Sequence, residues 1–305
     1  MTCVVICIVS FRDPRLIGRC LDALAQSTFT GFEVILCENG GQEARELLAA
    51  TLPTTLPGGQ PVTLLRQTTN LGYAGGVNAC MAARPDAEAW WILNPDTCPE
   101  PDALQALVAR LQRGTCDAAG GILYHPNGVI QAYGGRWNMW LARAESIGFG
   151  TPLAAPVDPQ QVEAQMNYLL GACMLVGRSF LEAAGPMRDD YFLYAEEIEW
   201  CLRARSRGMR LGFAPGARVC HGQGSTTGSA AHVHARPRLP VYLDERNKLH
   251  VVRDTAPARL IVAAPLAFIL AWARFGRRGA MQQWKNAMAG WWAGVRNQRG
   301  QPSWL

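Results

Sequence analysis

Strand-like and helix-like segments alternate four times in the first 115 residues, and this pattern limits the folds open to the chain. Short apolar runs, rich in β-branched residues, predict strands at Val4–Val9, Phe32–Cys37, Val62–Leu65 and Ala89–Leu93. Segments with apolar residues at helical spacing follow each of them. Such alternation indicates βαβ units and a twisted, mostly parallel sheet flanked by helices. We therefore predict an α/β fold.

The second half of the chain is less regular. Asp13-Pro14 is typical of a helix cap followed by the first helical position, and Pro215-Gly216 interrupts a later apolar run. Helices are predicted at residues 14–26, 43–50, 70–83, 102–113 and from about 195, and further strands at 120–124, 128–133 and 211–219. Residues 168–176 form an apolar stretch.

The composition excludes several other classes of protein. Of the 305 residues, 49% are apolar and 17% are charged, which excludes a disordered chain, a collagen-like fibre and a coiled coil.

The longest apolar run, Leu260–Ala273, is shorter than the ~18 residues that a membrane-spanning helix needs. Met1–Ser10 lacks the features of a secretory signal, so we expect a cytoplasmic protein. The ten cysteines are scattered, which favours reduced thiols over disulfides or zinc ligands.

Polar loops follow three predicted strands and begin at Glu38, Asn70 and Asn94. Because ligands bind at the carboxyl ends of strands in such sheets, we expect these loops to converge on one edge. Asn94-Pro95-Asp96-Thr97 places a carboxylate there, and one carboxylate with two phosphates is a usual way to hold Mg²⁺ or Mn²⁺. An Asx-turn that ends the strand is the simpler interpretation.

Three other segments carry side chains that could act in catalysis or ligand binding. Glu196, Glu197 and Glu199 follow an aromatic run, and such surroundings favour a general base, although acids also complement a helix N-terminus. The glycine-rich segment that begins at His221 could hold a phosphate or a metal, or be an ordinary loop. Arg246 could bind a phosphate or form a helix ion pair.

The order of these motifs is more specific than any one of them. The chain resembles the inverting family 2 glycosyltransferases of the GT-A fold, and within them the bacterial rhamnosyltransferase-like branch. The resemblance runs from Val4 to about Arg253. It rests on the segments at residues 8–11, 20–24, 70–76, 93–97, 171–175, 194–199 and 221–225, and on Tyr242 with Arg246-Asn247.

The resemblance implies a GT-A (Rossmann-like) domain at 1–254, with a nucleotide-sugar-binding half (1–115) and an acceptor-binding half (116–254), followed by a helical tail at 255–305. It implies Glu197 as the catalytic base and a divalent cation, Mg²⁺ or Mn²⁺, at Asp96 and His221. Donor-binding residues would be Ser10, Phe11, Glu38, Asn70, Gly72, Asn94, Asp96 and Arg246, and acceptor-binding residues Gly171, Ala172, Glu196 and Glu199.

The implied reaction moves a sugar, with rhamnose as the lead, from a nucleotide-diphosphate donor to a hydroxyl group of a glycan or lipid-linked saccharide in polysaccharide biosynthesis. Glu197 would remove the acceptor proton, and one displacement would invert the anomeric centre. The sequence departs from the family at Glu38, Glu197 and Glu199, where Asp is usual, and at Arg12, where many relatives have Asn.

Other functions fit less well. A nucleotidylyltransferase needs a glycine-rich basic loop after the first strand, and a nicotinamide dehydrogenase needs Gly-x-Gly-x-x-Gly there; Ser10–Pro14 is neither. A catalytically inert sugar-binding or scaffold protein on the same fold stays open, although the presence of both Asp96 and Glu197 argues against it.

The tail at 255–305 differs in composition from the rest. It holds seven basic residues, no acidic residue and five of the ten tryptophans, in a chain of net charge +5. Basic residues interleaved with tryptophan suit an anionic membrane surface, so we expect peripheral attachment to the inner face of the cell membrane. A helical hairpin packed on the domain and a homodimer interface are the alternatives. A nucleic-acid-binding surface is a weaker alternative, because no feature outside the tail favours one.

Overall fold

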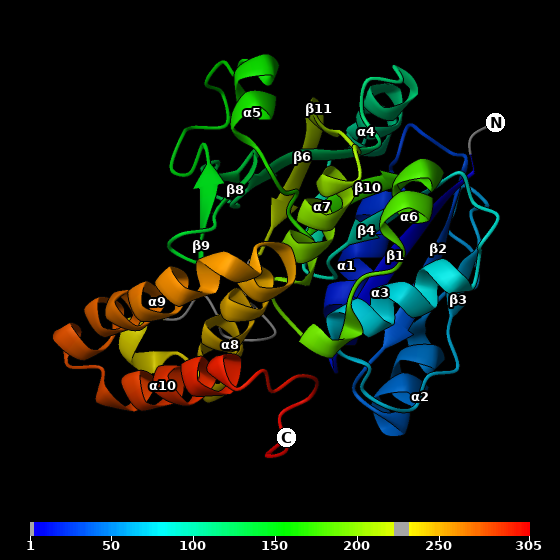
Figure 1. Ribbon diagram of the computed structural model, residues 1–305. Helices are drawn as coiled ribbons and strands as arrows, with labels where there is room; N and C mark the ends of the chain where they lie inside the picture. Colours follow the sequence, from blue (N-terminus) through cyan, green and yellow to red (C-terminus); the bar gives the residue numbers. More distant parts are fainter. Residues whose placement is uncertain (1–2, 223–231) are drawn as a thin grey trace.

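The computed structural model describes residues 3–222 and 232–305. Its centre is a nine-stranded sheet with the strand order β3-β2-β1-β4-β10-β6-β11-β5, with β7 paired to β6 (Figure 1). The strands are β1 (Val4–Ser10), β2 (Phe32–Glu38), β3 (Val62–Leu64), β4 (Ala89–Leu93), β5 (Thr97–Pro99), β6 (Ala118–Tyr124), β7 (Ile130–Ala132), β10 (Cys173–Gly177) and β11 (Leu211–His221).

The sheet is mostly parallel, as the sequence predicts. Strands β3, β2, β1, β4, β6 and β11 run in one direction, and β10, β5 and β7 run against them. Strand β10 lies between β4 and β6 and is antiparallel to both. An antiparallel strand begins at the edge where its parallel neighbours end. The segment before β10 therefore reaches the same edge as the ends of β1, β2 and β4.

Helices cover both faces of the sheet. They are α1 (Pro14–Leu24), α2 (Gln42–Thr51), α3 (Gly72–Ala82), α4 (Ala103–Gln112), α5 (Pro159–Gln165), α6 (Arg178–Ala184), α7 (Glu196–Ser206), α8 (Arg238–Thr255), α9 (Leu260–Arg274) and α10 (Met281–Val295). Alternate side chains of β1 enter different cores: Val5 and Cys7 pack in the core under α3, α6 and α7, and Ile6 and Ile8 in the core under α1, α2 and α4. A strand buried on both faces reads as the continuous apolar run seen in the sequence.

The first half of the chain agrees with the sequence prediction to within about three residues at each boundary. Asp13 caps α1, with its carboxylate accepting from the Leu16 N–H at 3.4 Å. The sequence missed the short strand β5, and in the second half it missed α5, α6, β10 and the hairpin of β8 (Gly134–Asn138) and β9 (Arg143–Ile147). The ten cysteines are free thiols, as expected.

The C-terminal tail is helical and packs on the rest of the domain through α8. A methyl group at Gly290 of α10 would lie 2.1 Å from the carbonyl oxygen of Tyr242 in α8, so the two helix backbones are in close contact. Trp291 of α10 donates to the carbonyl of Ala264 in α9 at 2.8 Å. The tail is therefore a layer of the domain rather than a separate unit.

Helix α9 is part of a longer apolar segment than the sequence suggests. The short helices η3 (Pro257–Arg259) and η4 (Gly276–Arg278) extend it to 22 residues, which is enough to cross a membrane by length and composition. We expected this apolar segment to be too short to span a membrane, and that expectation about its length is wrong. Ala263, Ala267 and Ala271 pack inward on protein, and the opposite side is exposed.

Candidate active site

The polar loops meet at the edge of the sheet where β1, β2 and β4 end, as the sequence predicts. The Asn39 side chain, directly after β2, donates to the carbonyl of Gly72 at 2.7 Å and accepts from the Leu71 N–H at 3.3 Å. After β4, the Asn94 N–H donates to the carbonyl of Ala172 at 3.3 Å. These bonds join the loops before α3 and β10 to the ends of β2 and β4.

Glu38 holds the loops after β1 and β2 together. Its buried carboxylate accepts from the Arg12 N–H at 2.9 Å, from the Gly40 N–H at 2.7 Å and from the Ser10 hydroxyl. A methyl group at Gly40 would lie 2.4 Å from the Arg12 side chain, so only glycine fits. Phe11, between the two anchored residues, is 40% exposed at this edge.

Asn70 and Gly72 shape the start of α3. The Asn70 side-chain oxygen accepts from the Gly72 N–H at 2.9 Å, which is an Asx-turn. Gly72 has a φ of +70°, and a methyl group there would lie 2.2 Å from the carbonyl oxygen of Phe192. The backbone of α3 therefore begins in direct contact with the segment that precedes α7.

Tyr73 links the loop after β4 to the loop before β10. Its hydroxyl lies 2.7 Å from the carbonyl oxygen of Gly171 and 3.0 Å from the side-chain oxygen of Asn94. Burial, followed by the charges of Glu196 and Glu197, raises the pKa of this phenol well above its usual value. Tyr73 is not among the predicted site residues, because its partner Gly171 is 98 residues away in the sequence.

Glu197 lies at the N-terminus of α7, next to Gly171. A methyl group at Gly171 would be 3.6 Å from Cβ and Cγ of Glu197 and 3.7 Å from the Tyr73 ring. Burial raises the pKa of the Glu197 carboxyl to about 7, although the N–H groups of the first helical turn oppose the shift. A carboxylate with a pKa near neutrality can accept a proton from a substrate hydroxyl.

The neighbouring acids differ from Glu197. Glu196 is buried, and its Oε2 has no hydrogen-bond partner within the described part of the chain. Burial and the adjacent charge of Glu197 raise the pKa of Glu196 well above its usual value. Glu199 instead binds the guanidinium of Arg203 through both oxygens, at 2.8 and 3.0 Å.

Asp96 and His221 meet at the same edge, because β11 pairs with β5 just after Asp96. His221 Nε2 lies 3.2 Å from Asp96 Oδ1. The other ring nitrogen, Nδ1, is 2.8 Å from the side-chain oxygen of Gln131, whose amide nitrogen in turn donates to the His221 carbonyl at 2.7 Å. Gln131 therefore accepts from Nδ1–H of His221 and orients the ring so that Nε2 faces Asp96.

The described ranges, 3–222 and 232–305, contain no cluster of three or more His, Cys, Asp or Glu side chains that could enclose a metal. The predicted glycine-rich segment after Gly222 lies outside them.

The sequence model of "Glycosyl transferase family 2" matches residues 5–183, more than half of the chain. This chain belongs to glycosyltransferase family 2. It is therefore an enzyme that transfers sugars. The match includes β1 to α6 and the edge where Glu38, Asp96 and Gly171 lie.

Relatives of this glycosyltransferase include a rhamnosyltransferase. The chain is 25% identical over 261 residues to the N-acetylglucosaminyl-diphospho-decaprenol L-rhamnosyltransferase of Mycobacterium tuberculosis, covering 78% of this chain and 83% of the relative. It is 32% identical over 182 residues to the low-salt glycan biosynthesis hexosyltransferase Agl10 of Haloferax volcanii, covering 59% and 56%.

Solved structures share the fold of this glycosyltransferase. The mannosyltransferase PcManGT from Pyrobaculum calidifontis, solved with GDP-Man and Mn²⁺, matches with a TM-score of 0.58 at 15% identity, over 97% of this chain and 87% of that one. TarS 1–349 from S. aureus matches with a TM-score of 0.57 at 14% identity, over 97% and 81%. The predicted GT-A fold is confirmed.

The residue roles in this glycosyltransferase remain predictions. The structure brings some of the predicted site residues together and buries others in contacts within the protein. Asn94, Asp96, Gly171, Ala172, Glu197 and His221 come together at one edge. Arg246 is buried, and its guanidinium donates within the protein, to the carbonyls of Tyr191 at 2.9 Å and Gly300 at 2.7 Å and to the side chain of Asn247 at 2.8 Å. Glu199 is likewise engaged by Arg203.

Proposed function

We propose that this glycosyltransferase transfers a sugar, with rhamnose as the lead, from a nucleotide-diphosphate donor to a hydroxyl group of a glycan or lipid-linked saccharide. The transfer inverts the anomeric centre, with Glu197 as general base. The resemblance to the mycobacterial rhamnosyltransferase supports the choice of rhamnose and of a diphospholipid-linked acceptor. The hexosyltransferase of glycan biosynthesis supports the broader class.

The observation that carries this proposal is the position of Glu197. Gly171 lies beside Cβ and Cγ of Glu197, and the Tyr73 hydroxyl links Gly171 to Asn94, two residues before Asp96. The base thus lies beside the loop where the donor phosphates are expected. Glu197 takes the proton of the acceptor hydroxyl, and that oxygen attacks the anomeric carbon as the bond to the donor phosphate breaks on the opposite face. The chain needs no second nucleophile for this displacement.

The residues at this edge suit a divalent cation bound together with the donor. Asp96 Oδ1 and His221 Nε2 lie 3.2 Å apart, and a carboxylate oxygen and an imidazole nitrogen are both ligands that a divalent cation such as Mn²⁺ accepts. Two protein ligands leave room for diphosphate oxygens, which is how Mg²⁺ is usually held. When bound there, the cation would neutralise charge on the departing nucleotide diphosphate.

A transfer assay tests the proposal. Purified protein is incubated with nucleotide-linked rhamnose and a panel of other donors, with Mn²⁺ or with EDTA, and the anomeric configuration of the product is determined by NMR. We expect inverted product that depends on the cation. The rate should rise as the pH passes through about 7, because Glu197 must lose its proton to act as a base.

Glu197→Gln should keep donor binding and lose transfer by about 10²–10⁴-fold, the usual contribution of a general base. Glu182→Gln, which makes the same change at an exposed position of α6, is the matched control and should transfer normally. Donor binding without transfer by the unaltered protein would favour the inert sugar-binding alternative.

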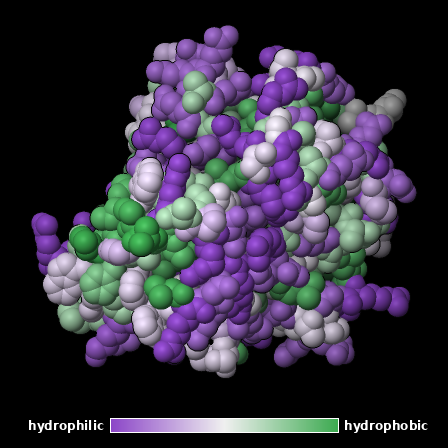
Figure 2. Space-filling view, in the orientation of Figure 1, coloured by the Kyte–Doolittle hydropathy of each residue, from purple (hydrophilic) through white to green (hydrophobic). Residues whose placement is uncertain are grey.

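We further infer that the tail attaches the enzyme to an anionic membrane surface through α9. Figure 2 shows a hydrophobic patch over this helix, and its exposed apolar residues are Ile261, Val262, Phe268, Ile269 and Trp272. Exposed Arg259, Arg277 and Arg278 flank the patch at the two ends of the helix. An apolar row between cations fits the headgroup region of an anionic bilayer, and each cation contributes roughly 1 kcal/mol.

A further inference from the structure

The segment before Glu196 has an unusual backbone. Phe192, Tyr194 and Ala195 have φ values of 68°, 75° and 68°, in the left-handed region that residues with a side chain rarely adopt. Such backbone conformations are strained and persist only where surrounding contacts impose them. This segment delivers Glu196 and Glu197 to the start of α7, so those contacts decide where the base lies.

Two adjacent residues of α8 supply many of the contacts. The amide nitrogen of Asn247 lies 3.0 Å from the carbonyl oxygen of Tyr191, 2.8 Å from that of Leu193 and 2.8 Å from that of Tyr194. Arg246 donates to the same Tyr191 carbonyl at 2.9 Å. Both side chains are buried, so water cannot replace them as donors.

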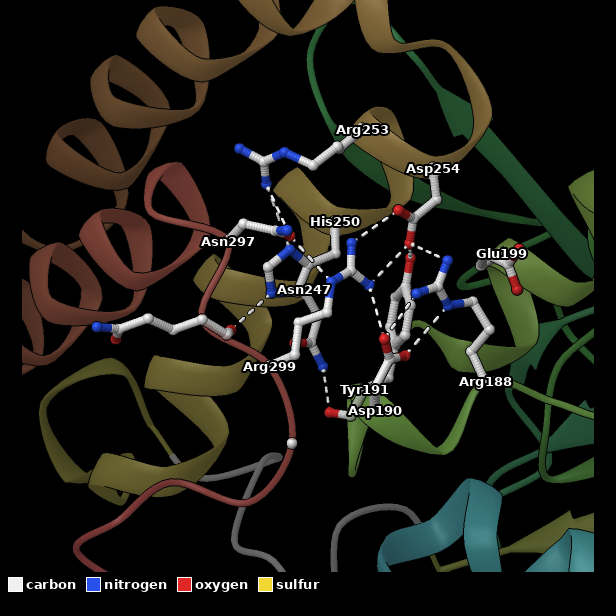
Figure 3. A network of polar contacts seen from close by, with 12 residues as sticks. Arg188, Asp190, Tyr191, Glu199, Asn247, His250, Arg253, Asp254, Asn297 and Arg299 are labelled. Atoms are coloured by element: carbon white, nitrogen blue, oxygen red, sulfur yellow. Dashed lines mark hydrogen bonds and ion pairs between the residues drawn. The ribbon is translucent and has the colours of Figure 1, made fainter.

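Arg299 and Gly300, which follow α10, add a second set of contacts. The Gly300 N–H donates to the carbonyl of Asp190 at 2.6 Å, and the Gly300 carbonyl accepts from Arg246 at 2.7 Å. Arg299 binds both oxygens of Asp254 at 2.7 and 2.9 Å and reaches Asp190 at 3.2 Å (Figure 3). The tail therefore contacts the segment directly and through Arg246.

Charges in this network are balanced and partly buried. Arg188 pairs with Asp190 at 2.6 Å and with Asp254 at 3.3 Å, so two arginines face two aspartates. Tyr191 completes it by donating from its hydroxyl to Asp254 at 2.8 Å. The planar guanidinium group of an arginine matches a carboxylate in geometry as well as in charge, so these ion pairs fix the relative orientation of the residues that they join.

The opposite side of the segment rests on α3. The Tyr73 N–H donates to the carbonyl of Phe192 at 2.6 Å, and Gly72 leaves the space that this carbonyl occupies. The segment is thus held between α3, which belongs to the donor side, and α8 with the tail. Release of the tail would leave the left-handed residues free to relax and carry Glu197 with them.

We propose that the tail residues Arg299 and Gly300, together with Arg246 and Asn247, are positioning residues that hold the segment 191–195 so that Glu197 reaches the acceptor hydroxyl. This inference rests on the proposed role of Glu197 as base. It gives the tail a part in transfer that is separate from membrane attachment, and it explains why Arg246 points into the protein rather than toward the donor.

Arg299→Ala tests this proposal, with Arg299→Lys as the conservative variant and Arg253→Ala as the control. Arg253 also fastens α8 to the tail, donating to the carbonyls of Gly294 at 2.7 Å and Val295 at 3.0 Å, but none of its contacts reaches residues 189–195 among those described. We expect Arg299→Ala to lower kcat by about 10–100-fold, the effect of a base displaced by about 1 Å. The KM for the donor should change less than twofold.

Arg299→Lys should recover part of kcat, because an ammonium keeps the charge but loses the fork. Arg253→Ala should keep kcat within about twofold even if its melting temperature falls. Equal loss of kcat in Arg253→Ala and Arg299→Ala, or an unchanged kcat in Arg299→Ala, would overturn the proposal. If Arg299→Ala does not fold, the comparison is made with Arg299→Gln.

Hydrogen–deuterium exchange provides a readout that does not depend on activity. Peptides covering residues 189–197 should exchange faster in Arg299→Ala than in Arg253→Ala, and exchange at the wild-type rate would contradict the proposal. If the wild-type protein transfers no sugar, the proposed function fails instead, and exchange still shows whether the tail holds this segment.

Discussion

At the residue scale, Glu196 and Glu197 show how two adjacent carboxyl groups obtain different chemistry. Both begin α7, and burial raises the pKa of each. The Glu197 side chain lies beside Gly171, and its carboxyl group has a pKa of about 7. Glu196 is more deeply buried, and its Oε2 has no hydrogen-bond partner among the described residues. A pKa near neutrality is what the proposed role of Glu197 as general base requires.

Glu196 should make stability fall as the pH rises. Its pKa in the folded protein is above that in the unfolded chain, so its contribution to stability is present below the unfolded value and lost as the pH rises through the folded value. Glu196→Gln removes this dependence. We expect its melting temperature to exceed that of the wild type more at pH 8.5 than at pH 5.5. A difference that is constant with pH would show that Glu196 does not take up a proton on folding.

The sequence could place the site residues but not their partners. Glu38, Asn70 and Asp96 lie at the predicted edge, because each follows a strand that periodicity identifies. The partners are set by contacts between residues far apart in the chain, such as Ser10 with Glu38 and Arg246 with Tyr191. No local pattern shows that the Arg246 guanidinium turns inward. Tyr73 was missed for the same reason, since its partner Gly171 is 98 residues away.

At the scale of elements, the packing of α10 on α8 depends on small residues. Gly290 touches the backbone of Tyr242, and a methyl group at Gly294 would lie 2.8 Å from the Arg246 carbonyl oxygen. The two helix backbones can approach this closely because Gly290 and Gly294 of α10 carry no side chain at the contact. This contact also places the residues after α10 against the segment 189–191.

Gly290→Ala should destabilise the protein by about 1–3 kcal/mol, because the added methyl group must displace α10 from α8. Gly18→Ala is the matched control, since Gly18 is inside α1, is exposed and has open space around its Cα. That change should stabilise by about 0.5–1 kcal/mol through helix propensity. Chemical denaturation measures both. Equal effects of the two changes would mean that the contact is not tight.

The elements of the first half were predictable because each strand is followed at once by its helix. In the second half, β10 runs against its neighbours and β8 forms an antiparallel hairpin with β9, so neither belongs to a repeating βα unit. The segments that the sequence missed there are short, and short segments carry little periodicity.

At the scale of the molecule, the exposed apolar residues of α9 lie on one face of the domain, and the candidate active site lies at the edge of the sheet where β1, β2 and β4 end. We expect the wild type to co-sediment with vesicles that contain anionic lipid. Charge reversal at Arg259, Arg277 and Arg278 should abolish most of this binding at physiological salt. Arg274 is unsuitable for this test because it pairs with Asp244 at 2.9 Å and supports the fold.

Charge reversal at the exposed Arg15, Arg113 and Arg207, which lie outside the tail, gives the matched control. If both triple variants sediment alike, α9 is not the membrane contact. Truncation after Asp254 would be uninformative, because it removes the partner of Asp254 and exposes α8.

The contact of Gly300 with Asp190 also has a consequence for synthesis of the protein. Glu197 is translated about a hundred residues before Gly300, which at roughly 5–20 residues per second is an interval of about 5–20 s. During that interval the nascent sheet can form, while the segment before Glu197 still lacks its contacts with Arg299 and Gly300. On the positioning role proposed above, a nascent chain that ends before residue 299 should transfer sugar about 10–100-fold more slowly than the finished enzyme.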